Sequence, residues 1–443
     1  YHISGGEKAM KRKITEKLAA WKNKKDKMPL ILDGTRQVGK TYSALEFGRS
    51  SYANTAYFNF ENSPGLGKIF DGELEPEKII RDLEIFSMQK ISPENTLVVF
   101  DEIQSSERAL TSLKYFCERA PQYHIIAAGS LLGVALNRSR YSFPVGKTER
   151  LAMHPMDFEE FLWALGLDGL AEAIRESFAS SAPLATHDRA LEAMKKYIVT
   201  GGMPKAVAEY AEHKDFNYVT AVQKSLVNDY VADMAKYATP QDTARIIAAW
   251  NSVPAQLAKE NHKFQYKLIK RGARSAEYET AITWLESSGI IHRCVRTAQG
   301  ELPLSAYADD AAFKIYLADT GLLCSKFEIP PNVVIETPLA FNQFKGALAE
   351  NCVMQALAAN GVRPYYWTHD NRYEVDFVFQ NARGDVIPLE VKSSEHTTSK
   401  SLSVYTARYK PPYALRASQK NFGFENGIRS IPLYALFCLD GGI

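Results

Sequence analysis

Short apolar runs alternate with amphipathic stretches in the N-terminal part of the chain. Between Met28 and Leu162 the runs are PLILDG, AYFNFE, TLVVFDE, YHIIAAGS and ERLAMHP, and helical spacing separates them. Strands that alternate with helices in this way are typical of a parallel sheet with helices on both faces. The pattern therefore predicts a three-layer α/β core.

The pattern changes after residue 162. Residues 163–240 read as helix, and residues 241–330 as three helical stretches followed by a hairpin, which is typical of a winged-helix module. The proline-rich EIPPNVV marks a boundary, and residues 335–443 return to α+β. We therefore predict an α/β core over 1–162, a helical lid over 163–240, a winged helix over 241–330 and an α+β domain over 335–443.

The N-terminal segment EKAMKRKITEKLAAWKNKKDK is basic and helical. Ile14, Leu18 and Trp21 share one face, which predicts a helix that docks on the α/β core. Its lysine face is either solvated or a contact for a polyanion.

A phosphate loop follows the first strand. GTRQVGKT matches G-x-x-x-x-G-K-[ST] between a strand and a helix, where backbone N–H groups can surround a phosphate. Lys40 reaches phosphate oxygens, and the Thr41 hydroxyl ligates Mg²⁺. The predicted residues for binding ATP or ADP are Gly34, Thr35, Arg36, Gln37, Val38, Gly39, Lys40, Thr41 and Tyr42.

Acidic residues end the strand TLVVFDE. Asp101 can hold the Mg²⁺ shell, and Glu102 can act as the general base toward water. The following strand ends in Ser130, a candidate sensor of the terminal phosphate. The long segment between Thr41 and Thr96 leaves room for a strand, AYFNFE, between the two motif strands.

Three arginines follow Ser130. Arg138, Arg140 or Arg150 could act as an arginine finger on a neighbouring subunit of a homo-oligomer, although each could equally be an ordinary surface residue.

A second candidate site lies in the stretch YEVDFVFQNARGDVIPLEVKSS. Side chains of a strand alternate between its faces, so Asp376 shares a face with Glu374, and Glu390 shares one with Lys392. Asp376 and Glu390, with Glu350 from a preceding helix, suit Mg²⁺, and Lys392 can orient a water or stabilise a phosphate. Cross-strand Glu–Lys pairs on a solvated sheet are the ordinary alternative.

The predicted winged helix offers a surface for DNA. Basic residues precede its helix, but acids within that helix would repel phosphates. The basic residues are Lys263, Lys267, Lys270, Arg271 and Arg274, and the acids are Glu277, Glu279 and Glu286.

Composition narrows the class of protein. With 443 residues, 46% hydrophobic and 23% charged, the chain is typical of a multidomain globular protein, and its net charge of +2 excludes a histone-like polycation. Five scattered cysteines without C-x-x-C spacing predict neither a zinc ribbon nor a disulfide framework, and favour a cytoplasmic setting. No signal-peptide core or membrane-length apolar run is expected.

The motifs together resemble a known family. GTRQVGKT, FDEIQ, AAGSLLG, SFPVGKTERLAMHPMDFEEFL, TGGMP and AFKIYLADTGLL are similar to the bacterial and archaeal AAA+-type ATPases that carry a C-terminal domain of unknown function. The resemblance covers nearly the whole chain from about Met10. It implies an AAA+ core and a C-terminal domain of restriction-endonuclease-like, PD-(D/E)xK, fold, with Val375 in place of the expected proline.

Three functions are compatible with these features. The first is an ATPase coupled to a nuclease at Asp376, Glu390 and Lys392, acting on nucleic acid and on DNA rather than RNA. The second is a signalling or remodelling ATPase whose C-terminal domain only binds a partner, such as a protein. A transcription regulator that uses the winged helix is a third.

Overall fold

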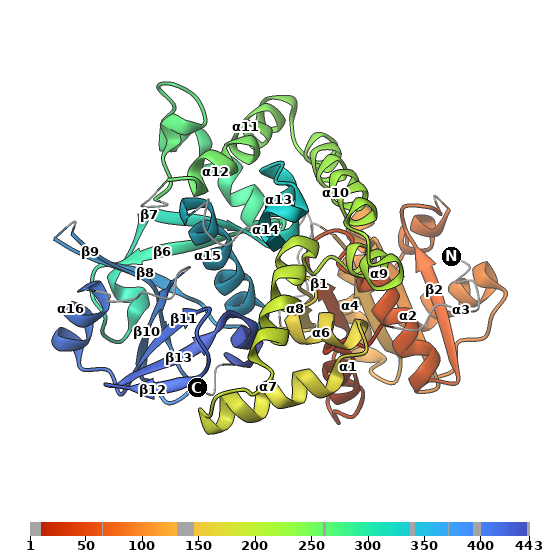
Figure 1. Cartoon of the computed structure of the whole chain (residues 1–443). Helices are drawn as coiled ribbons and strands as arrows, with labels where there is room; N and C mark the ends of the chain where they lie inside the picture. The colour runs from red at the N-terminus through yellow and green to blue at the C-terminus, as the bar shows by residue number, and fades with distance from the viewer. Residues whose placement is uncertain are drawn as a thin grey trace. The chain divides into compact units, whose positions relative to one another are not determined.

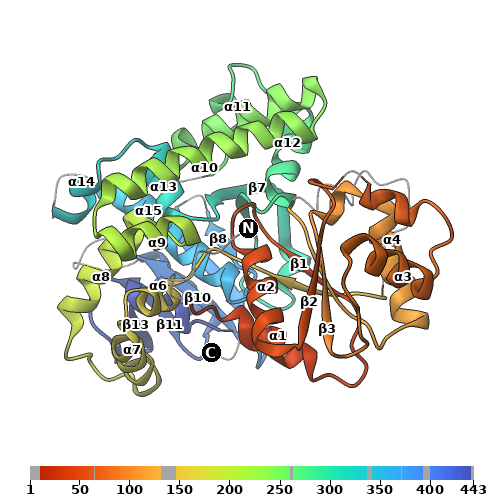
Figure 2. The same cartoon turned by 90° about the vertical axis from the view of Figure 1, so that its right-hand side faces the viewer.

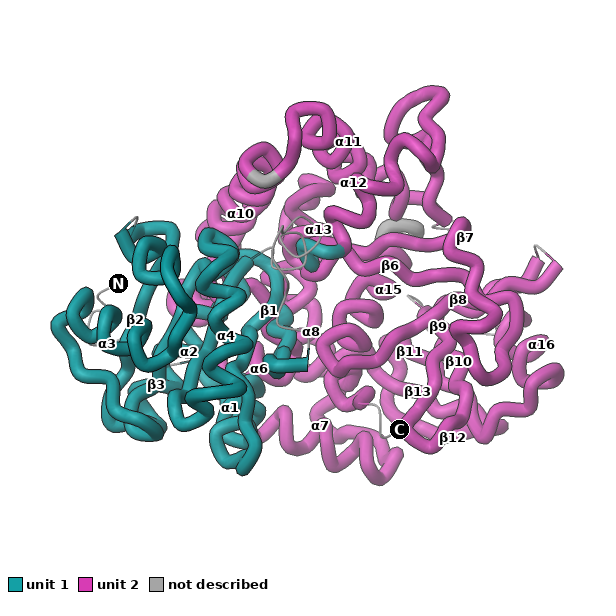
Figure 3. Tube along the Cα trace, turned by 180° about the vertical axis from the view of Figure 1, so that it is seen from behind, with its two compact units in different colours: residues 1–154, 287–289 teal, residues 155–286, 290–443 magenta. Residues whose placement is uncertain are grey.

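The computed structural model describes residues 10–63, 65–130, 146–259, 263–336, 342–370, 372–392 and 400–440. The chain (Figure 1) divides into two compact units, which Figure 3 shows in different colours. They are here called unit 1 (residues 1–154 and 287–289) and unit 2 (residues 155–286 and 290–443). The described residues form one five-stranded sheet in unit 1 and one eight-stranded sheet in unit 2. No helix in these ranges has the length and apolar character needed to cross a membrane.

Unit 1 has the alternating strands and helices that its apolar runs predict. In chain order they are α1 (Ile14–Lys22), β1 (Leu30–Asp33), α2 (Lys40–Ser51), β2 (Asn54–Asn59), η1 (Leu66–Phe70), α3 (Pro76–Ser87), β3 (Thr96–Asp101), η2 (Ile103–Ser105), α4 (Glu107–Arg119), β4 (His124–Ala128) and β5 (Glu149–Ala152). The strands are parallel, in the order β2-β3-β4-β1-β5.

The extra strand of this sheet is not the one that we predicted. The run AYFNFE forms most of β2, which lies at the edge of the sheet. The strand that separates β1 from β3 is β4, from the run YHIIAAGS. The apolar run predicts that β2 exists. The order of the strands depends on how they pack, which the apolar pattern of the sequence does not determine.

Both faces of the unit 1 sheet are buried. Val98 and Phe100 face a cluster that includes apolar residues of α3 and α4, which lie beside each other in Figure 2. Leu97 and Val99 face the opposite cluster, which includes apolar residues of α1 and α2. The predicted apolar stripe of α1 is buried in this second cluster, so the docking of the N-terminal helix is confirmed.

Unit 2 begins with helices. They are α6 (Phe158–Ala164), α7 (Asp168–Ser180), α8 (His187–Thr200), α9 (Pro204–His213), α10 (Phe216–Tyr237), α11 (Pro240–Leu257), η3 (Tyr266–Leu268) and α12 (Ser275–Ser287). The later elements are β6 (Ile291–Thr297), η4 (Leu304–Tyr307), β7 (Ala308–Leu317), α13 (Thr320–Lys326), α14 (Pro331–Glu336), α15 (Asn342–Ala359), β8 (Tyr365–His369), β9 (Tyr373–Gln380), β10 (Val386–Val391), α16 (Lys400–Tyr409), β11 (Ala414–Ser418), β12 (Gly423–Glu425), β13 (Ile428–Pro432) and η5 (Leu433–Cys438).

The predicted wing is part of a larger sheet. Strands β6 and β7 pair as a hairpin after α12, as expected, but β6 also pairs in parallel with β8, with Val295 opposite Tyr365 (Figure 1). The strand order β12-β13-β11-β10-β9-β8-β6-β7 therefore crosses the boundary that EIPPNVV suggested between 330 and 335. The winged-helix, lid and endonuclease-like assignments, with their limits, stay predictions.

The predicted hairpin of residues 373–394 is present over its described part. Strands β9 and β10 are antiparallel, with Leu389 opposite Phe377. Phe377 and Leu389 are fully buried, as alternation along the two strands predicts. The opposite face of the hairpin carries the acidic residues.

Candidate functional site

The phosphate loop of unit 1 joins the end of β1 to the start of α2. Gly34 and Gly39 have φ values of 144° and 97°, where glycine is favoured. A β-carbon on Gly34 would lie 2.2 Å from the carbonyl oxygen of Met153, so the backbones approach too closely for any side chain. The loop geometry thus explains the glycines and leaves backbone N–H groups at the start of α2 available for an anion.

Two polar groups of this loop suit a nucleotide phosphate. Lys40 is 7% exposed. Its Nζ donates to the carbonyl oxygens of Gly34, at 2.9 Å, and Thr35, at 2.7 Å. Burial lowers the pKa of Lys40 to about 8, although the charges of Glu102, Asp33 and Asp101 oppose this. The Thr35 hydroxyl is buried and has no hydrogen-bond partner among the described residues. An anionic phosphate would satisfy both groups, so the residues fit ATP or ADP.

The two predicted Mg²⁺ ligands of unit 1 lie together. Asp101 ends β3 and is 4% exposed, and its Oδ1 accepts a hydrogen bond from the Thr41 hydroxyl at 3.0 Å. A hydroxyl and a carboxylate in contact beside a phosphate loop match the oxygen ligands that Mg²⁺ prefers.

Two residues that the sequence did not single out hold Asp101 from the next strand. The Tyr57 hydroxyl donates to Asp101 Oδ2 at 2.7 Å, and Asn59 Nδ2 donates to the same oxygen at 3.2 Å. In the sheet, Asn59 lies opposite Asp101. Alternation along AYFNFE puts Tyr57 and Asn59 on one face, but only the knowledge that β2 neighbours β3 would have connected them to Asp101.

We expect Tyr57→Phe to weaken the binding of the Mg²⁺ that supports ATP hydrolysis. The variant loses one donor that orients the Asp101 carboxylate, and outer partners of a metal ligand are worth roughly 10-fold or more in metal affinity. The apparent Mg²⁺ constant, measured from initial rates at saturating ATP, should rise by about that factor while the melting temperature stays close to that of the wild type. Tyr115→Phe on α4 is the control, and an unchanged Mg²⁺ constant for Tyr57→Phe would exclude this role.

Glu102 and Ser130 are also brought together. Glu102 has a φ of 51°, and its Oε2 accepts hydrogen bonds from the Ser130 hydroxyl at 3.3 Å and from Gln104 Nε2. Ser130 is 1% exposed and follows β4. The order of the sheet, with β4 beside β3, is what places the predicted sensor against the predicted base. Gln104 was not predicted.

Arginines near the loop have structural partners. Arg12, which was not predicted, donates to the carbonyl oxygens of Val38 at 3.0 Å and of His154 at 2.9 Å. Arg150 forms an ion pair with Asp33. The other two arginine-finger candidates, Arg138 and Arg140, lie outside the described residues.

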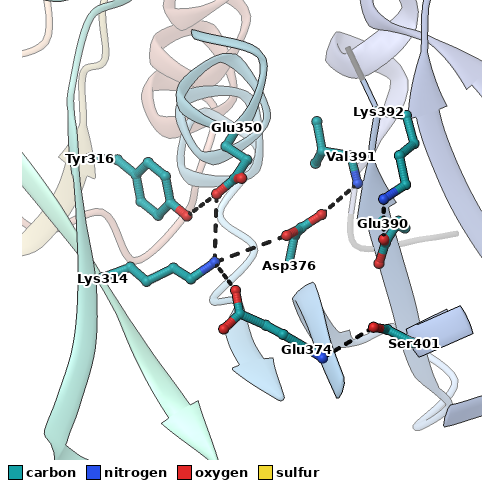
Figure 4. A network of polar contacts seen from close by, with 9 residues as sticks. All are labelled: Lys314, Tyr316, Glu350, Glu374, Asp376, Glu390, Val391, Lys392 and Ser401. Atoms are coloured by element: carbon teal, nitrogen blue, oxygen red, sulfur yellow. Dashed lines mark hydrogen bonds and ion pairs between the residues drawn. The ribbon is translucent and has the colours of Figure 1, made fainter. Parts of the chain in front are cut away.

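A second polar site lies in unit 2 (Figure 4). We call Glu350 of α15, Glu374 and Asp376 of β9, and Glu390 of β10 the carboxylate cluster. Asp376 Oδ2 accepts from the backbone N–H of Val391 at 2.8 Å, and Lys392 Nζ lies 2.6 Å from a Glu390 oxygen. The predicted residues are thus neighbours, as the hairpin implied.

The cluster also contains a cation that the sequence did not suggest. Lys314 of β7 is 1% exposed, and its Nζ lies 2.6 Å from a Glu374 oxygen (Figure 4). Burial, followed by the charges of Glu350 and Glu390, raises the pKa of Asp376 well above its usual range. Within the described residues, no group of three or more His, Cys, Asp or Glu side chains is arranged to hold a metal ion. The metal role of Glu350, Asp376 and Glu390 stays a prediction.

Comparison with known proteins identifies three matching families. Residues 26–162 match a family described as an AAA domain, residues 191–332 match a domain of unknown function (DUF8612), and residues 345–436 match another (DUF4143). No curated protein matches the chain in sequence.

Several solved structures are similar to this chain, at low sequence identity and with low TM-scores. A Walker-type ATPase of Pyrococcus abyssi, PABY2304, is 16% identical over 72% of this chain and 96% of that chain, with a TM-score of 0.44. The Aeropyrum pernix ORC2 protein in its ADPNP–ADP complexes is 14% identical over 75% and 93%, with a TM-score of 0.38. The Thermotoga maritima RuvB Holliday junction branch migration motor is 13% identical over 67% and 91%, with a TM-score of 0.30.

The phosphate loop and the AAA-domain match agree with each other. Residues 26–162 contain the whole phosphate loop, Asp101 and Glu102, in the strand order described above. This protein is an ATPase whose residues 26–162 match an AAA domain, and ATP or ADP with Mg²⁺ is its cofactor.

Proposed function

We propose that this ATPase binds nucleic acid and that ATP hydrolysis, with Glu102 as the general base, controls this binding. In this proposal Thr41 and Asp101 hold Mg²⁺, and Lys40 binds phosphate. Glu102 accepts a proton from the attacking water, and Ser130 and Gln104 orient its carboxylate. The contact of Glu102 Oε2 with Ser130 supports these roles, because a carboxylate fixed on one oxygen keeps the other in a constant direction.

An exposed basic segment of unit 2 carries the nucleic-acid part of the proposal. Between residues 263 and 274, five basic side chains are exposed, and none forms an ion pair with another described residue. These are Lys263, Lys267, Lys270, Arg271 and Arg274. Buried or paired cations would contribute little to binding a polyanion, whereas exposed ones release counterions from phosphates.

The acids of α12 oppose this surface less than the sequence suggested. Arg293 on β6 is ion-paired with Glu279 at 2.7 Å and with Glu286 at 3.1 Å. Burial raises the pKa of Glu286, and the charge of Arg293 opposes this shift. The repulsion that we expected from α12 is therefore partly neutralised within the unit.

We expect the combined variant Lys267→Glu, Lys270→Glu, Arg271→Glu to lose DNA binding. If each cation contacts one phosphate, the slope of log affinity against log salt should fall by about 3, and affinity near 0.1 M salt should drop by roughly 100-fold. Fluorescence anisotropy with a labelled duplex, at several salt concentrations and with ATP or ADP present, measures both quantities.

The matched control changes the same net charge elsewhere. Lys114→Glu, Lys205→Glu and Lys224→Glu alter exposed lysines outside the segment. Equal weakening in both variants, or no difference in affinity between the ATP and ADP states, would favour the signalling or remodelling alternative, in which the partner is a protein. Tighter binding of single-stranded RNA than of duplex DNA would correct the substrate class.

Cleavage of nucleic acid is not part of this proposal. Of the carboxylates predicted to bind a catalytic metal ion, Glu350 and Asp376 face Lys314, and Glu390 forms an ion pair with Lys392.

A further inference from the structure

Lys314 lies at the point toward which three of the four acids of the carboxylate cluster converge. Its Nζ lies 2.6 Å from Glu374 Oε1, 3.6 Å from Glu350 Oε2 and 4.0 Å from Asp376 Oδ1 (Figure 4). Lys314 comes from β7, Glu374 from β9 and Glu350 from α15. Elements distant in sequence therefore meet at one ammonium group. The Tyr366 ring lies on the same ammonium, with its centroid 5.3 Å away.

The cluster requires a cation on physical grounds. Several carboxylates close together in a poorly solvated place repel one another, unless a positive charge or bound protons compensate. Glu390 already has Lys392 at 2.6 Å, whereas Glu350, Glu374 and Asp376 share Lys314.

The surroundings hold this ammonium in its charged form. Burial by itself lowers the pKa of Lys314, but the charges of the three carboxylates outweigh that effect and the net pKa is raised. The Tyr316 hydroxyl donates to Glu350 Oε2 at 2.8 Å, the same oxygen that faces Lys314. The orientation of Glu350 is therefore fixed from a second side.

We propose that Lys314 is the resident cation of the carboxylate cluster and occupies the place that a divalent metal ion would take. The cluster is then a latent site for a hard divalent cation such as Mn²⁺ or Mg²⁺, whose oxygen ligands are Glu350, Glu374 and Asp376. In the wild type, the ion pairs of Lys314 connect β7, β9 and α15 without a metal ion. A lysine side chain is covalently attached and does not exchange, so chelators should not affect it.

With Lys314 in this place, the C-terminal part of unit 2 differs from a metal-dependent nuclease. Activation of water and stabilisation of a pentavalent phosphate by a metal need that ion in contact with the carboxylates. With the ammonium in that place, the predicted residues Glu350, Asp376, Glu390 and Lys392 form ion pairs instead. This inference does not depend on whether the ATPase acts on nucleic acid.

Binding of Mn²⁺ tests the proposal. Electron paramagnetic resonance measures free Mn²⁺ in titrations of the nucleotide-free protein of 443 residues. The variants are Lys314→Met, which keeps the length of the side chain without its charge, and Asp376→Asn, which removes a ligand of the latent site. Lys326→Met is the control, because Lys326 is a largely buried lysine that packs on the Trp250 ring, at 3.9 Å from its centroid, outside the cluster.

We expect Lys314→Met to bind one more Mn²⁺ than the wild type, with a dissociation constant below about 1 mM, and the Lys314→Met, Asp376→Asn double variant to lose it. Mn²⁺ should also raise the melting temperature of Lys314→Met, but not that of the wild type or of Lys326→Met.

Two results would overturn the proposal. One is a Mn²⁺ site in the wild type that Asp376→Asn abolishes. This test uses no Lys314 variant, so it can be made even if Lys314→Met does not fold. The other is a folded Lys314→Met protein, with normal ATP hydrolysis, that binds no additional Mn²⁺. Recovery of a poorly folding Lys314→Met protein by Mn²⁺ would support it.

Discussion

Replacing Glu102 with glutamine is expected to lower the rate of ATP hydrolysis by roughly 100- to 10,000-fold while ATP binding is retained. Glutamine has nearly the same shape as glutamate and can still accept from the Ser130 hydroxyl, which lies 3.3 Å from Oε2 in the wild type. It cannot take a proton from water. The loss should therefore fall on kcat, with little change in the affinity for nucleotide.

The comparison with Ser130→Ala separates the base from its orientation. Ser130→Ala keeps the carboxylate but removes one hydrogen bond to it, so a loss smaller than that of Glu102→Gln is expected. Hydrolysis at the wild-type rate by Glu102→Gln would mean that another group is the base.

Replacing Gly202 with alanine should destabilise unit 2 by about 3–4 kcal/mol. A β-carbon at Gly202 would lie 1.9 Å from the carbonyl oxygen and 2.7 Å from the nitrogen of Met156. Both backbone groups of Gly202 are engaged, since its N–H donates to Asp319 at 2.5 Å and its carbonyl accepts from Met156 at 2.6 Å. Neither chain can move away without losing a buried hydrogen bond.

Urea unfolding followed by tryptophan fluorescence measures this effect, because four of the five tryptophans, Trp163, Trp250, Trp284 and Trp367, belong to unit 2. Gly169→Ala in α7 is the matched control. Its β-carbon would meet no atom within 4 Å, and alanine is the better helix former, so stability should be unchanged or higher by up to about 1 kcal/mol. Similar midpoints for the two variants would show that the contact with Met156 is not rigid.

The phosphate loop and the apolar runs were predictable from the sequence because their causes are local. A strand, a glycine-containing turn and a helix N-terminus lie within a few residues, so Lys40 and Thr41 could be assigned directly. The pairing of Thr41 with Asp101 followed from the known geometry of parallel sheets. Tyr57 could not be assigned, because its role depends on which strand neighbours β3.

The carboxylate cluster could likewise be predicted only in part, because its members come from elements far apart in the sequence. Alternation along β9 and β10 placed Asp376 and Glu390 on the polar face of a hairpin, as found. Lys314 lies on β7, inside the run AFKIYLADTGLL, where its neighbours Phe313 and Ile315 are buried and nothing local indicates a partner. Only the strand order β9-β8-β6-β7 and the position of α15 bring the lysine to the acids.

Unit 1 is expected to hydrolyse ATP with Lys40 on the phosphates and Glu102 as the general base. Phosphate release measured side by side for the wild type, Glu102→Gln and Lys40→Ala, together with binding of a fluorescent ATP analogue, tests it most directly. We predict hydrolysis and binding in the wild type, binding without hydrolysis in Glu102→Gln, and loss of both in Lys40→Ala. Equal rates of phosphate release from the wild type and Glu102→Gln would contradict the account.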